Sequence, residues 1–200
     1  MSQPIDQDIR ICFLGDSFVI GVGDETGLGW AGRLCVKALQ SGYSVTCYNL
    51  GIRRNTSRDI LSRWEAECDL RLPDFCDGRV VVSLGVNDTA IEDGQVRVTP
   101  DESFENVYEI IRSVRSKYPV IMVGPPPTHD DEQNKRIEAI SLSFRNAAKL
   151  AGVSYIEPFY FLVGDERYRA EILSNDGAHP RSYGYQRISE IISHSGHWWF

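Results

Sequence analysis

The chain has 200 residues, of which 42% are hydrophobic and 24% charged, so it is long enough to bury a sizeable core. Its formal net charge is -7, and no stretch is rich in Lys and Arg. A surface that binds nucleic-acid phosphates needs a basic patch, so we expect no nucleic-acid partner. We expect a single domain over residues 1–200.

The first ten residues, MSQPIDQDIR, are polar and acidic. They lack the basic start and the apolar centre of a signal peptide. No stretch of the sequence approaches the ~20 apolar residues of a membrane-spanning helix. We therefore expect a cytoplasmic protein with no stable membrane insertion.

The number of cysteines is odd, and no two of them have Cys-x-x-Cys spacing. Most lie in apolar segments, which favours buried free thiols in a reducing compartment over disulfides or metal ligands. The cysteines are Cys12, Cys35, Cys47, Cys68 and Cys76. No two histidines have metal-ligand spacing, so we expect no metal.

Glycines are frequent between residues 21 and 29, but their spacing misses the dinucleotide fingerprint by one residue. Asp24 and Glu25 lie among them and would repel a pyrophosphate. We therefore expect no cofactor.

Short apolar runs alternate along the chain with segments that have helical periodicity. A continuous apolar run is typical of a buried parallel strand, and apolar residues every three to four positions are typical of a helix. Strands are predicted at 11–14, 45–50, 79–84, 120–123 and 153–156. Helices are predicted at 30–40, 58–68, 100–114, 132–151 and 185–195, with a loop or short helix over 157–173.

This alternation predicts parallel strands joined by right-handed crossovers, with helices on both faces. The fold class is therefore α/β, a three-layer α/β/α sandwich around a five-stranded parallel sheet. Ligands bind at the carboxyl ends of the strands in such sheets, so candidate functional residues are those that follow a strand.

Gly15, Asp16 and Ser17 end the first predicted strand. Glycine allows a sharp bend, and the sheet would fix a serine hydroxyl presented at the tip of such a turn. Ser17 is therefore a candidate nucleophile, although a Gly-Asp-Ser sequence is more often only a turn. We expect Asp16 to be structural and to hydrogen-bond the turn.

A nucleophilic serine needs a base, and His179 has the best context of the four histidines. Asp176 precedes it by three residues, so one turn can place the carboxylate against one ring nitrogen and leave the other facing a substrate. The alternative is an Asp-His pair on the surface. We expect His129 to be a solvated loop residue, with a substrate-side role as the alternative, and we expect surface or packing roles for His194 and His197.

Acyl transfer also needs donors for the oxyanion that forms on attack. The backbone N–H of Gly51, the side-chain amide of Asn87 and the N–H of Ser17 all follow predicted strands. Alone, they could be a turn glycine and a capping asparagine. Because they lie at neighbouring strand ends, we interpret them as an oxyanion hole. Asp88 is expected to tie down its loop.

Together these segments resemble the SGNH hydrolases, also called the GDSL esterase/lipase family. The resemblance covers most of the chain in order. Its four blocks are Gly15-Asp16-Ser17, Gly51, Gly85-Val86-Asn87-Asp88 and Asp176-Gly177-Ala178-His179. The first block is followed by Phe18 where the family often has leucine, which affects only local packing. The Gly-x-Ser-x-Gly elbow of the α/β-hydrolases is absent.

The resemblance implies a flavodoxin-like SGNH hydrolase fold. It also implies a catalytic triad of Ser17 as nucleophile, His179 as base and Asp176 as the residue that orients the base. The oxyanion hole would consist of Ser17, Gly51 and Asn87.

We therefore predict a serine esterase or lipase-type acyl hydrolase that cleaves a carboxylic ester through an acyl-enzyme. A carbohydrate O-deacetylase or a thioesterase could use the same triad, and a catalytically silent ligand-binding module could keep the same fold. The substrate would be a small-molecule, lipid or sugar ester, selected by the loops at 89–98, 125–131 and 157–173.

The sequence ends in the aromatic run Trp198-Trp199-Phe200. Three exposed aromatic side chains would be unusual on a monomer. We expect this tail either to fold back onto the body or to be buried in a homodimer.

Overall fold

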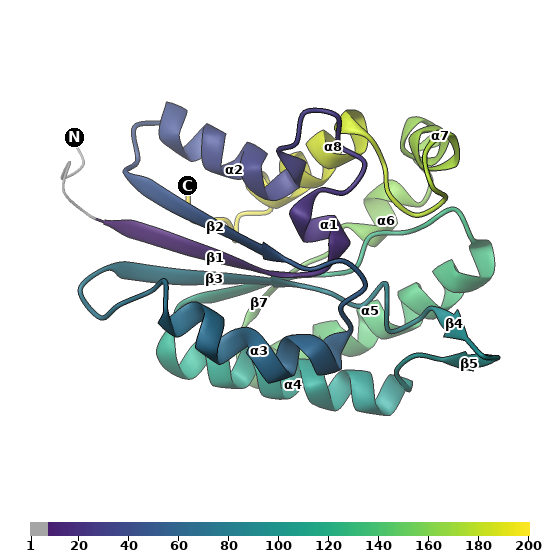
Figure 1. The fold of residues 1–200 in the computed structure, drawn as a ribbon, viewed down its shortest axis with the longest axis horizontal. Helices are drawn as coiled ribbons and strands as arrows, with labels where there is room; N and C mark the ends of the chain where they lie inside the picture. Colours follow the sequence, from purple (N-terminus) through teal and green to yellow (C-terminus); the bar gives the residue numbers. More distant parts are fainter. Residues whose placement is uncertain (1–7) are drawn as a thin grey trace.

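The computed structural model describes residues 8–200. Residues 1–7, on which the prediction of no signal peptide mainly rests, lie outside the described residues. The main sheet has five parallel strands in the order β2-β1-β3-β6-β7, as predicted for a flavodoxin-like fold (Figure 1). The strands are β1 (Ile9–Gly15), β2 (Val45–Gly51), β3 (Asp77–Ser83), β6 (Val120–Val123) and β7 (Ser154–Ile156).

Helices cover both faces of the sheet, which confirms the three-layer architecture (Figure 1). One face carries α1 (Ser17–Ile20), α2 (Gly29–Gln40), α6 (Phe159–Leu162), α7 (Glu166–Ser174) and α8 (Ser182–Ser193). The other carries α3 (Ser57–Asp69), α4 (Pro100–Lys117) and α5 (Asp131–Ala151).

The central strand β1 shows why its sequence is a continuous apolar run. Ile11 and Phe13 belong to the core cluster on the α2 and α8 face, whereas Cys12 and Leu14 belong to the cluster on the other face. Successive side chains of a strand point to opposite faces, so a strand covered on both sides is apolar throughout.

The register of the neighbouring strands β2, β1 and β3 brings the candidate site residues to one end of the sheet. Gly15 of β1 is level with Gly51 of β2 and with Ser83 of β3. The segments that follow these residues therefore meet at the carboxyl end of the sheet, on the right of Figure 1.

A small antiparallel hairpin near this edge was not predicted from the sequence. It pairs β4 (Ile91–Glu92) with β5 (Gln95–Val96). Asp93 and Gly94 form its turn with φ angles of 50° and 77°. An Asp-Gly pair is favoured in such turns, so the signal was present in the sequence, although the strands are very short.

The opposite edge, where the strands begin, is closed by the C-terminal tail. The Trp198 ring lies 6.4 Å from the Phe13 ring, and the Arg79 guanidinium lies over the rings of Trp199 and Phe200. The tail therefore folds back onto the body, which is one of the two predicted alternatives.

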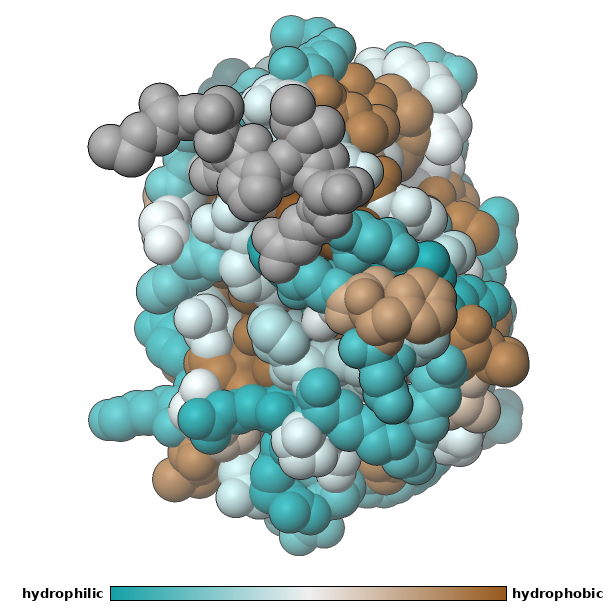
Figure 2. All heavy atoms as spheres, turned by 90° about the vertical axis from the view of Figure 1, so that its left-hand side faces the viewer, coloured by the Kyte–Doolittle hydropathy of each residue, from teal (hydrophilic) through white to brown (hydrophobic). Residues whose placement is uncertain are grey.

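Figure 2 shows the molecule from the side at which the strands begin; hydrophilic residues cover much of it, and hydrophobic residues form separate patches. Among residues 8–200, none of the helices combines the length and the apolar character needed to cross a bilayer.

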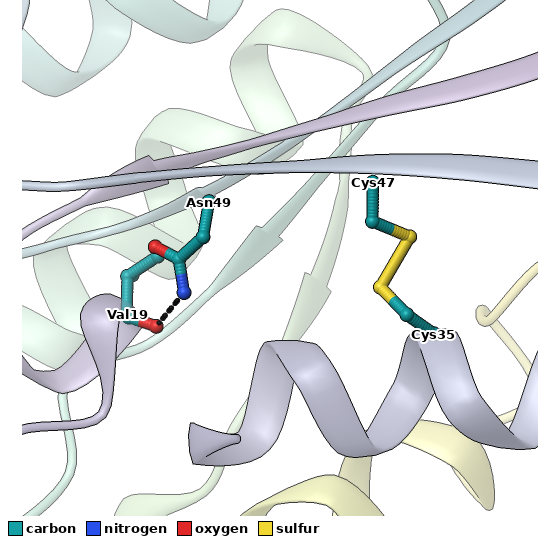
Figure 3. Close-up of a disulfide and its surroundings, with 4 residues drawn as sticks. All are labelled: Val19, Cys35, Cys47 and Asn49. Atoms are coloured by element: carbon teal, nitrogen blue, oxygen red, sulfur yellow. Dashed lines mark hydrogen bonds between the residues drawn. A yellow bond between two sulfur atoms is a disulfide. The ribbon is translucent and has the colours of Figure 1, made fainter. Parts of the chain in front are cut away.

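The prediction of free thiols is wrong for two of the five cysteines. Cys35 of α2 and Cys47 of β2 form a disulfide, with Cα atoms 6.4 Å apart (Figure 3). Their separation of 12 residues spans a helix and a strand that pack together, and the sequence does not show that pairing. Cys12, Cys68 and Cys76 are free, as predicted. Disulfides are rare in reducing compartments, so the cysteines no longer support the predicted cytoplasmic location.

Candidate active site

The candidate nucleophile lies where β1 turns into α1. The Asp16 side chain accepts a hydrogen bond from the Phe18 N–H (2.9 Å) and caps α1, which begins at Ser17. A Cβ atom on Gly15 would lie 2.1 Å from the Ser83 carbonyl oxygen, so only glycine fits beside β3. The tight turn leaves Ser17 buried but at the carboxyl end of the sheet, as predicted.

The candidate base lies in the loop between α7 and α8. Asp176 Oδ1 accepts hydrogen bonds from the backbone N–H groups of Ala178 (3.0 Å) and His179 (2.8 Å), which fold the loop into a turn. This turn brings Asp176 Oδ2 to 2.7 Å from His179 Nδ1. The three-residue spacing therefore gives the predicted Asp-His pair.

The two loops meet although Ser17 and His179 are 162 positions apart in the sequence. His179 Nε2 lies 2.7 Å from Ser17 Oγ. The imidazole also packs against the Phe18 ring, with centroids 4.9 Å apart. An imidazole held between a hydroxyl and a carboxylate can accept the serine proton while the carboxylate stabilises the imidazolium.

The side chain of Asp176 is 41% exposed, whereas that of His179 is 10% exposed. Partial burial raises the pKa of Asp176, but the hydrogen bonds from His179 and Ala178 outweigh this effect and leave its pKa below the usual value. The carboxylate is therefore ionised at neutral pH, which suits a residue that orients an imidazole.

A second histidine contacts the same loop, which sequence reasoning missed. His129 Nδ1 lies 2.9 Å from the Gly177 carbonyl oxygen, and its backbone N–H donates to that oxygen at 3.2 Å. His129 therefore joins the loop after β6 to the loop that carries the candidate base. The prediction of a solvated loop residue did not include this contact with Gly177.

The Asn87 side chain lies next to the nucleophile turn, as predicted from its place after β3. Its Nδ2 donates to Asp16 Oδ2 at 3.1 Å and to the Asn55 carbonyl oxygen at 3.0 Å. Asp16 is therefore more than the turn residue that we expected, because it also contacts a candidate oxyanion donor.

The predicted role of Gly51 as an oxyanion donor stays a prediction. Its backbone N–H donates to Asn49 Oδ1 at 3.0 Å, and Asn49 Nδ2 donates to the Val19 carbonyl oxygen at 2.8 Å (Figure 3). A Cβ atom on Gly51 would lie 2.4 Å from the Ile20 nitrogen. Because Gly51 has no side chain, α1 packs closely on β2, and Asn49 accepts the hydrogen bond from the Gly51 N–H. An asparagine two residues before a turn glycine is the signal that could have indicated this.

Two buried carboxyl groups, those of Asp16 and Asp88, lie near the carboxyl end of the sheet. Burial raises the pKa of Asp16 to about 7, because the hydrogen bonds from Phe18 and Asn87 offset the lost hydration only in part. Burial also raises the pKa of Asp88. Asp88 accepts hydrogen bonds from the Ser57 N–H and from Ser103 Oγ, and so ties down its loop as predicted.

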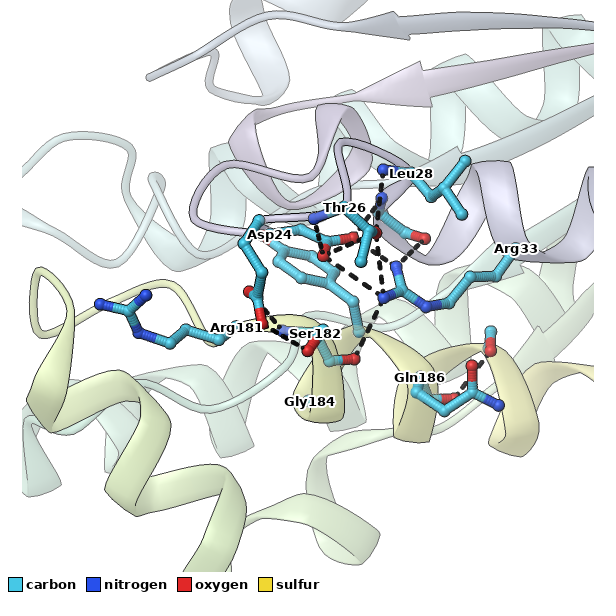
Figure 4. Close-up of polar contacts among 12 residues, drawn as sticks. Asp24, Thr26, Leu28, Arg33, Arg181, Ser182, Gly184 and Gln186 are labelled. Carbon is cyan, nitrogen blue, oxygen red and sulfur yellow. Dashed lines mark hydrogen bonds and ion pairs between the residues drawn. The ribbon is translucent and has the colours of Figure 1, made fainter.

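A polar network connects the loop after α1 with the start of α8, which follows the loop that carries His179 (Figure 4). Arg33 of α2 forms an ion pair with the buried Asp24 and donates to the Ser182 carbonyl oxygen at 3.3 Å. Glu25 accepts from the Ser182 hydroxyl at 2.6 Å. Ser182 follows His179 by three residues, so these contacts hold the two halves of the site together.

Within residues 8–200, no group of three or more His, Cys, Asp or Glu side chains could hold a metal ion.

Comparison with known families gives a match over most of the chain. The model of the GDSL-like lipase/acylhydrolase family matches residues 13–187, a range that contains Ser17, Asn87, Asp176 and His179. No curated protein matches the chain in sequence.

Solved structures similar to this one share its fold over nearly their whole length. A lipase/acylhydrolase from Enterococcus faecalis is 21% identical, with a TM-score of 0.74 over 93% of this chain and 94% of that one. An acetylxylan esterase from Geobacillus stearothermophilus is 19% identical, with a TM-score of 0.75 over 94% and 93%. The psychrotrophic esterase EstA from Pseudoalteromonas sp. is 19% identical, with a TM-score of 0.70 over 92% and 94%.

Proposed function

Since the chain belongs to the GDSL-like lipase/acylhydrolase family, its reaction is the hydrolysis of an ester bond, and we propose that Ser17, His179 and Asp176 carry it out on carboxylic esters. The observation that carries this proposal is the continuous contact from Ser17 Oγ to His179 Nε2 and from His179 Nδ1 to Asp176, at 2.7 Å each. The Ser-His-Asp arrangement is defined by this geometry and not by sequence position.

In the first half of the reaction, Ser17 Oγ forms a bond to the ester carbonyl carbon while His179 Nε2 takes its proton. The imidazolium is stabilised by Asp176. It then gives the proton to the leaving alcohol as the carbon–oxygen bond breaks, and an acyl-enzyme remains. In the second half, water attacks the acyl-enzyme with His179 as base, and the carboxylic acid and Ser17 are released.

The negative charge that develops on the carbonyl oxygen needs preorganised donors. Ser17 is the first residue of α1, so its backbone N–H has no acceptor within the helix. The Asn87 amide lies beside the same turn. We propose these two groups and the Gly51 N–H as oxyanion donors. The Gly51 N–H is bonded to Asn49 and the Asn87 amide to Asp16 and Asn55, and an N–H can be shared between two acceptors.

Labelling with a fluorophosphonate probe tests the nucleophile directly. We expect the wild type to be labelled and to hydrolyse chromogenic esters, and Ser17→Ala to do neither. A Ser62→Ala variant is the matched control, because Ser62 is exposed on α3, and it should be labelled normally. An unlabelled wild type would indicate the non-catalytic binding module, and an active Ser17→Ala would exclude Ser17 as nucleophile.

The oxyanion donor is tested by steady-state kinetics. We expect Asn87→Ala to lower kcat by about a hundredfold or more, with little change in KM, because its amide acts mainly in the transition state. A change confined to KM would mean that Asn87 binds the substrate and not the oxyanion.

The acyl group and the alcohol are tested with an ester series. A carbohydrate O-deacetylase is the second candidate, and the similar acetylxylan esterase fold is what favours it. We expect release of acetate from acetylated xylan if this candidate is correct, and faster cleavage of longer acyl esters if it is not. A thioester of the same acyl group tests the thioesterase alternative.

A further inference from the structure

Both hydrogens of the Asn87 amide are donated within the protein. One goes to Asp16 Oδ2 (3.1 Å) and the other to the Asn55 carbonyl oxygen (3.0 Å). The amide plane is therefore fixed before any substrate arrives. A donor held in this way contributes to catalysis without the cost of reorganisation, and an N–H can be shared between two acceptors when an oxyanion forms.

Asp16 uses its two carboxyl oxygens for two different partners. Oδ1 accepts from the Phe18 N–H and caps α1, while Oδ2 accepts from Asn87, which is 71 positions away in the sequence. The helix cap requires only the first of these contacts. The side chain is 2% exposed, so the contact with Asn87 is shielded from water and its geometry is well defined.

We propose that Asp16 is a positioning residue of the oxyanion hole, acting through the hydrogen bond that its Oδ2 accepts from the Asn87 amide. This inference rests on the proposed function. It assigns to Asp16 a role in the reaction itself, in addition to its role in the turn.

The charge of Asp16 is compatible with this role. An ionised carboxylate beside the oxyanion would repel it, but burial raises the pKa of Asp16 to about 7. A large fraction of the molecules therefore carries a neutral Asp16 at neutral pH, and the carbonyl oxygen of a neutral carboxyl group still accepts a hydrogen bond.

Asp16→Asn tests the proposal, because asparagine has the same shape but a single acceptor oxygen for the two N–H donors of Phe18 and Asn87. We expect kcat to fall by about tenfold with KM within about twofold, a size typical of coupling within one hydrogen-bond network. In an Asn87→Ala background the same change should alter kcat by less than about twofold, since the group that Asp16 positions is already gone.

Asp88→Asn is the matched control. Asp88 is also a buried carboxyl group, but it accepts from Ser57 and Ser103 and not from the Asn87 amide. Its effect on kcat should be the same factor with and without Asn87→Ala. An equal cost of Asp16→Asn in both backgrounds would show that Asp16 acts only on the structure, and would overturn the proposal.

If Asp16→Asn does not fold, as judged by near-ultraviolet circular dichroism, Asp16→Ser replaces it. Serine is a good helix cap but is too short to reach Asn87, so the same loss of kcat is expected. Full activity of Asp16→Ser would overturn the proposal. Probe labelling of the wild type at Ser17 tests the nucleophile with Asp16 and Asn87 unchanged, so a failure of the proposed function is distinguishable from a failure of this inference.

Discussion

Asp16 and Asp176 lie beside the candidate nucleophile and base, and their surroundings move their pKa values in opposite directions. Asp16 is almost fully buried, and burial raises its pKa to about 7. Asp176 is partly solvated, and hydrogen bonds hold its pKa below the usual value. The same residue type is therefore partly protonated at neutral pH in one position and ionised in the other.

The pKa of Asp16 predicts a pH dependence of stability. An unfolded chain ionises Asp16 near its ordinary pKa of 3.8, whereas the folded protein ionises it at about 7. The folded state therefore holds the extra proton between these values, and the contribution of Asp16 to stability falls as the pH rises from about 4 to about 7.

We expect the contribution of Asp16 to the free energy of unfolding, measured in urea, to fall by on the order of 3 kcal/mol over this pH range, since one pKa unit is worth about 1.4 kcal/mol. Asp16→Asn should remove this part of the pH dependence. Parallel pH curves for the two proteins would contradict the prediction.

At the residue scale, the contact between Asp176 and His179 could be predicted from the sequence, because a spacing of three residues and a turn place them together. The roles of Asn49 and Asp16 could not, because they depend on which of several nearby donors and acceptors pair. The hydrogen bond from the Gly51 N–H to Asn49 is one such pairing.

At the scale of secondary-structure elements, the loop between α1 and α2 and the start of α8 are held by Asp24 and Arg33. Asp24 also accepts from the backbone N–H groups of Thr26 (3.0 Å) and Gly29 (2.8 Å). Burial raises the pKa of Asp24, but Arg33 and these N–H groups outweigh it and lower the pKa to about 2. The ionised side chain therefore stabilises the loop at neutral pH.

We expect Asp24→Asn to lower the free energy of unfolding by about 2 kcal/mol at pH 7. The stabilisation by Asp24 is complete above pH about 4 and is lost as the pH falls toward 2, so the difference between the proteins should shrink in that range. Glu132→Gln, which removes an exposed ion pair with Lys135, is the control and should change stability by less than about 0.5 kcal/mol. Equal effects of the two variants on the free energy of unfolding would contradict this prediction.

The disulfide joins α2 to the edge strand β2 and gives a second prediction for the elements. We expect the double variant Cys35→Ala/Cys47→Ala to lower the free energy of unfolding by about 2–3 kcal/mol under oxidising conditions, as expected for a short closed loop. Dithiothreitol should lower the stability of the wild type, and leave the variant unchanged. No effect of dithiothreitol on the wild type would indicate free thiols, the original prediction.

The five strands and the long helices could be predicted because each has many residues with one clear periodicity. The hairpin of β4 and β5 has two residues per strand, too few for a pattern. The disulfide depends on the side-by-side packing of α2 and β2, which is tertiary information.

At the scale of the whole molecule, the C-terminal aromatic residues close the end of the sheet opposite the candidate site. Phe200 lies 4.6 Å from the Tyr43 ring, and Trp198 packs on the core residue Phe13. These rings shield apolar surface at a place far from the site. Their contribution should therefore be to stability and not to chemistry.

We expect truncation after His197 to lower the free energy of unfolding by several kcal/mol, because three partly buried aromatic side chains are lost. The kcat of the folded fraction should stay within about twofold of the wild type. Light scattering of both proteins tests the predicted homodimer. Unchanged stability together with a halved mass would place the role of the tail between two copies of the chain.

The 162 positions between Ser17 and His179 have a consequence for the making of this enzyme. A growing chain presents the proposed nucleophile early, but the proposed base emerges from the ribosome only near the end of synthesis. Under the proposed mechanism, a partly made chain therefore has no base for Ser17 and should not cleave esters. A break between Asp93 and Gly94, in the turn of the hairpin, would divide the site into a serine-bearing fragment and a histidine-bearing fragment. Neither fragment alone would then hold both proposed catalytic residues.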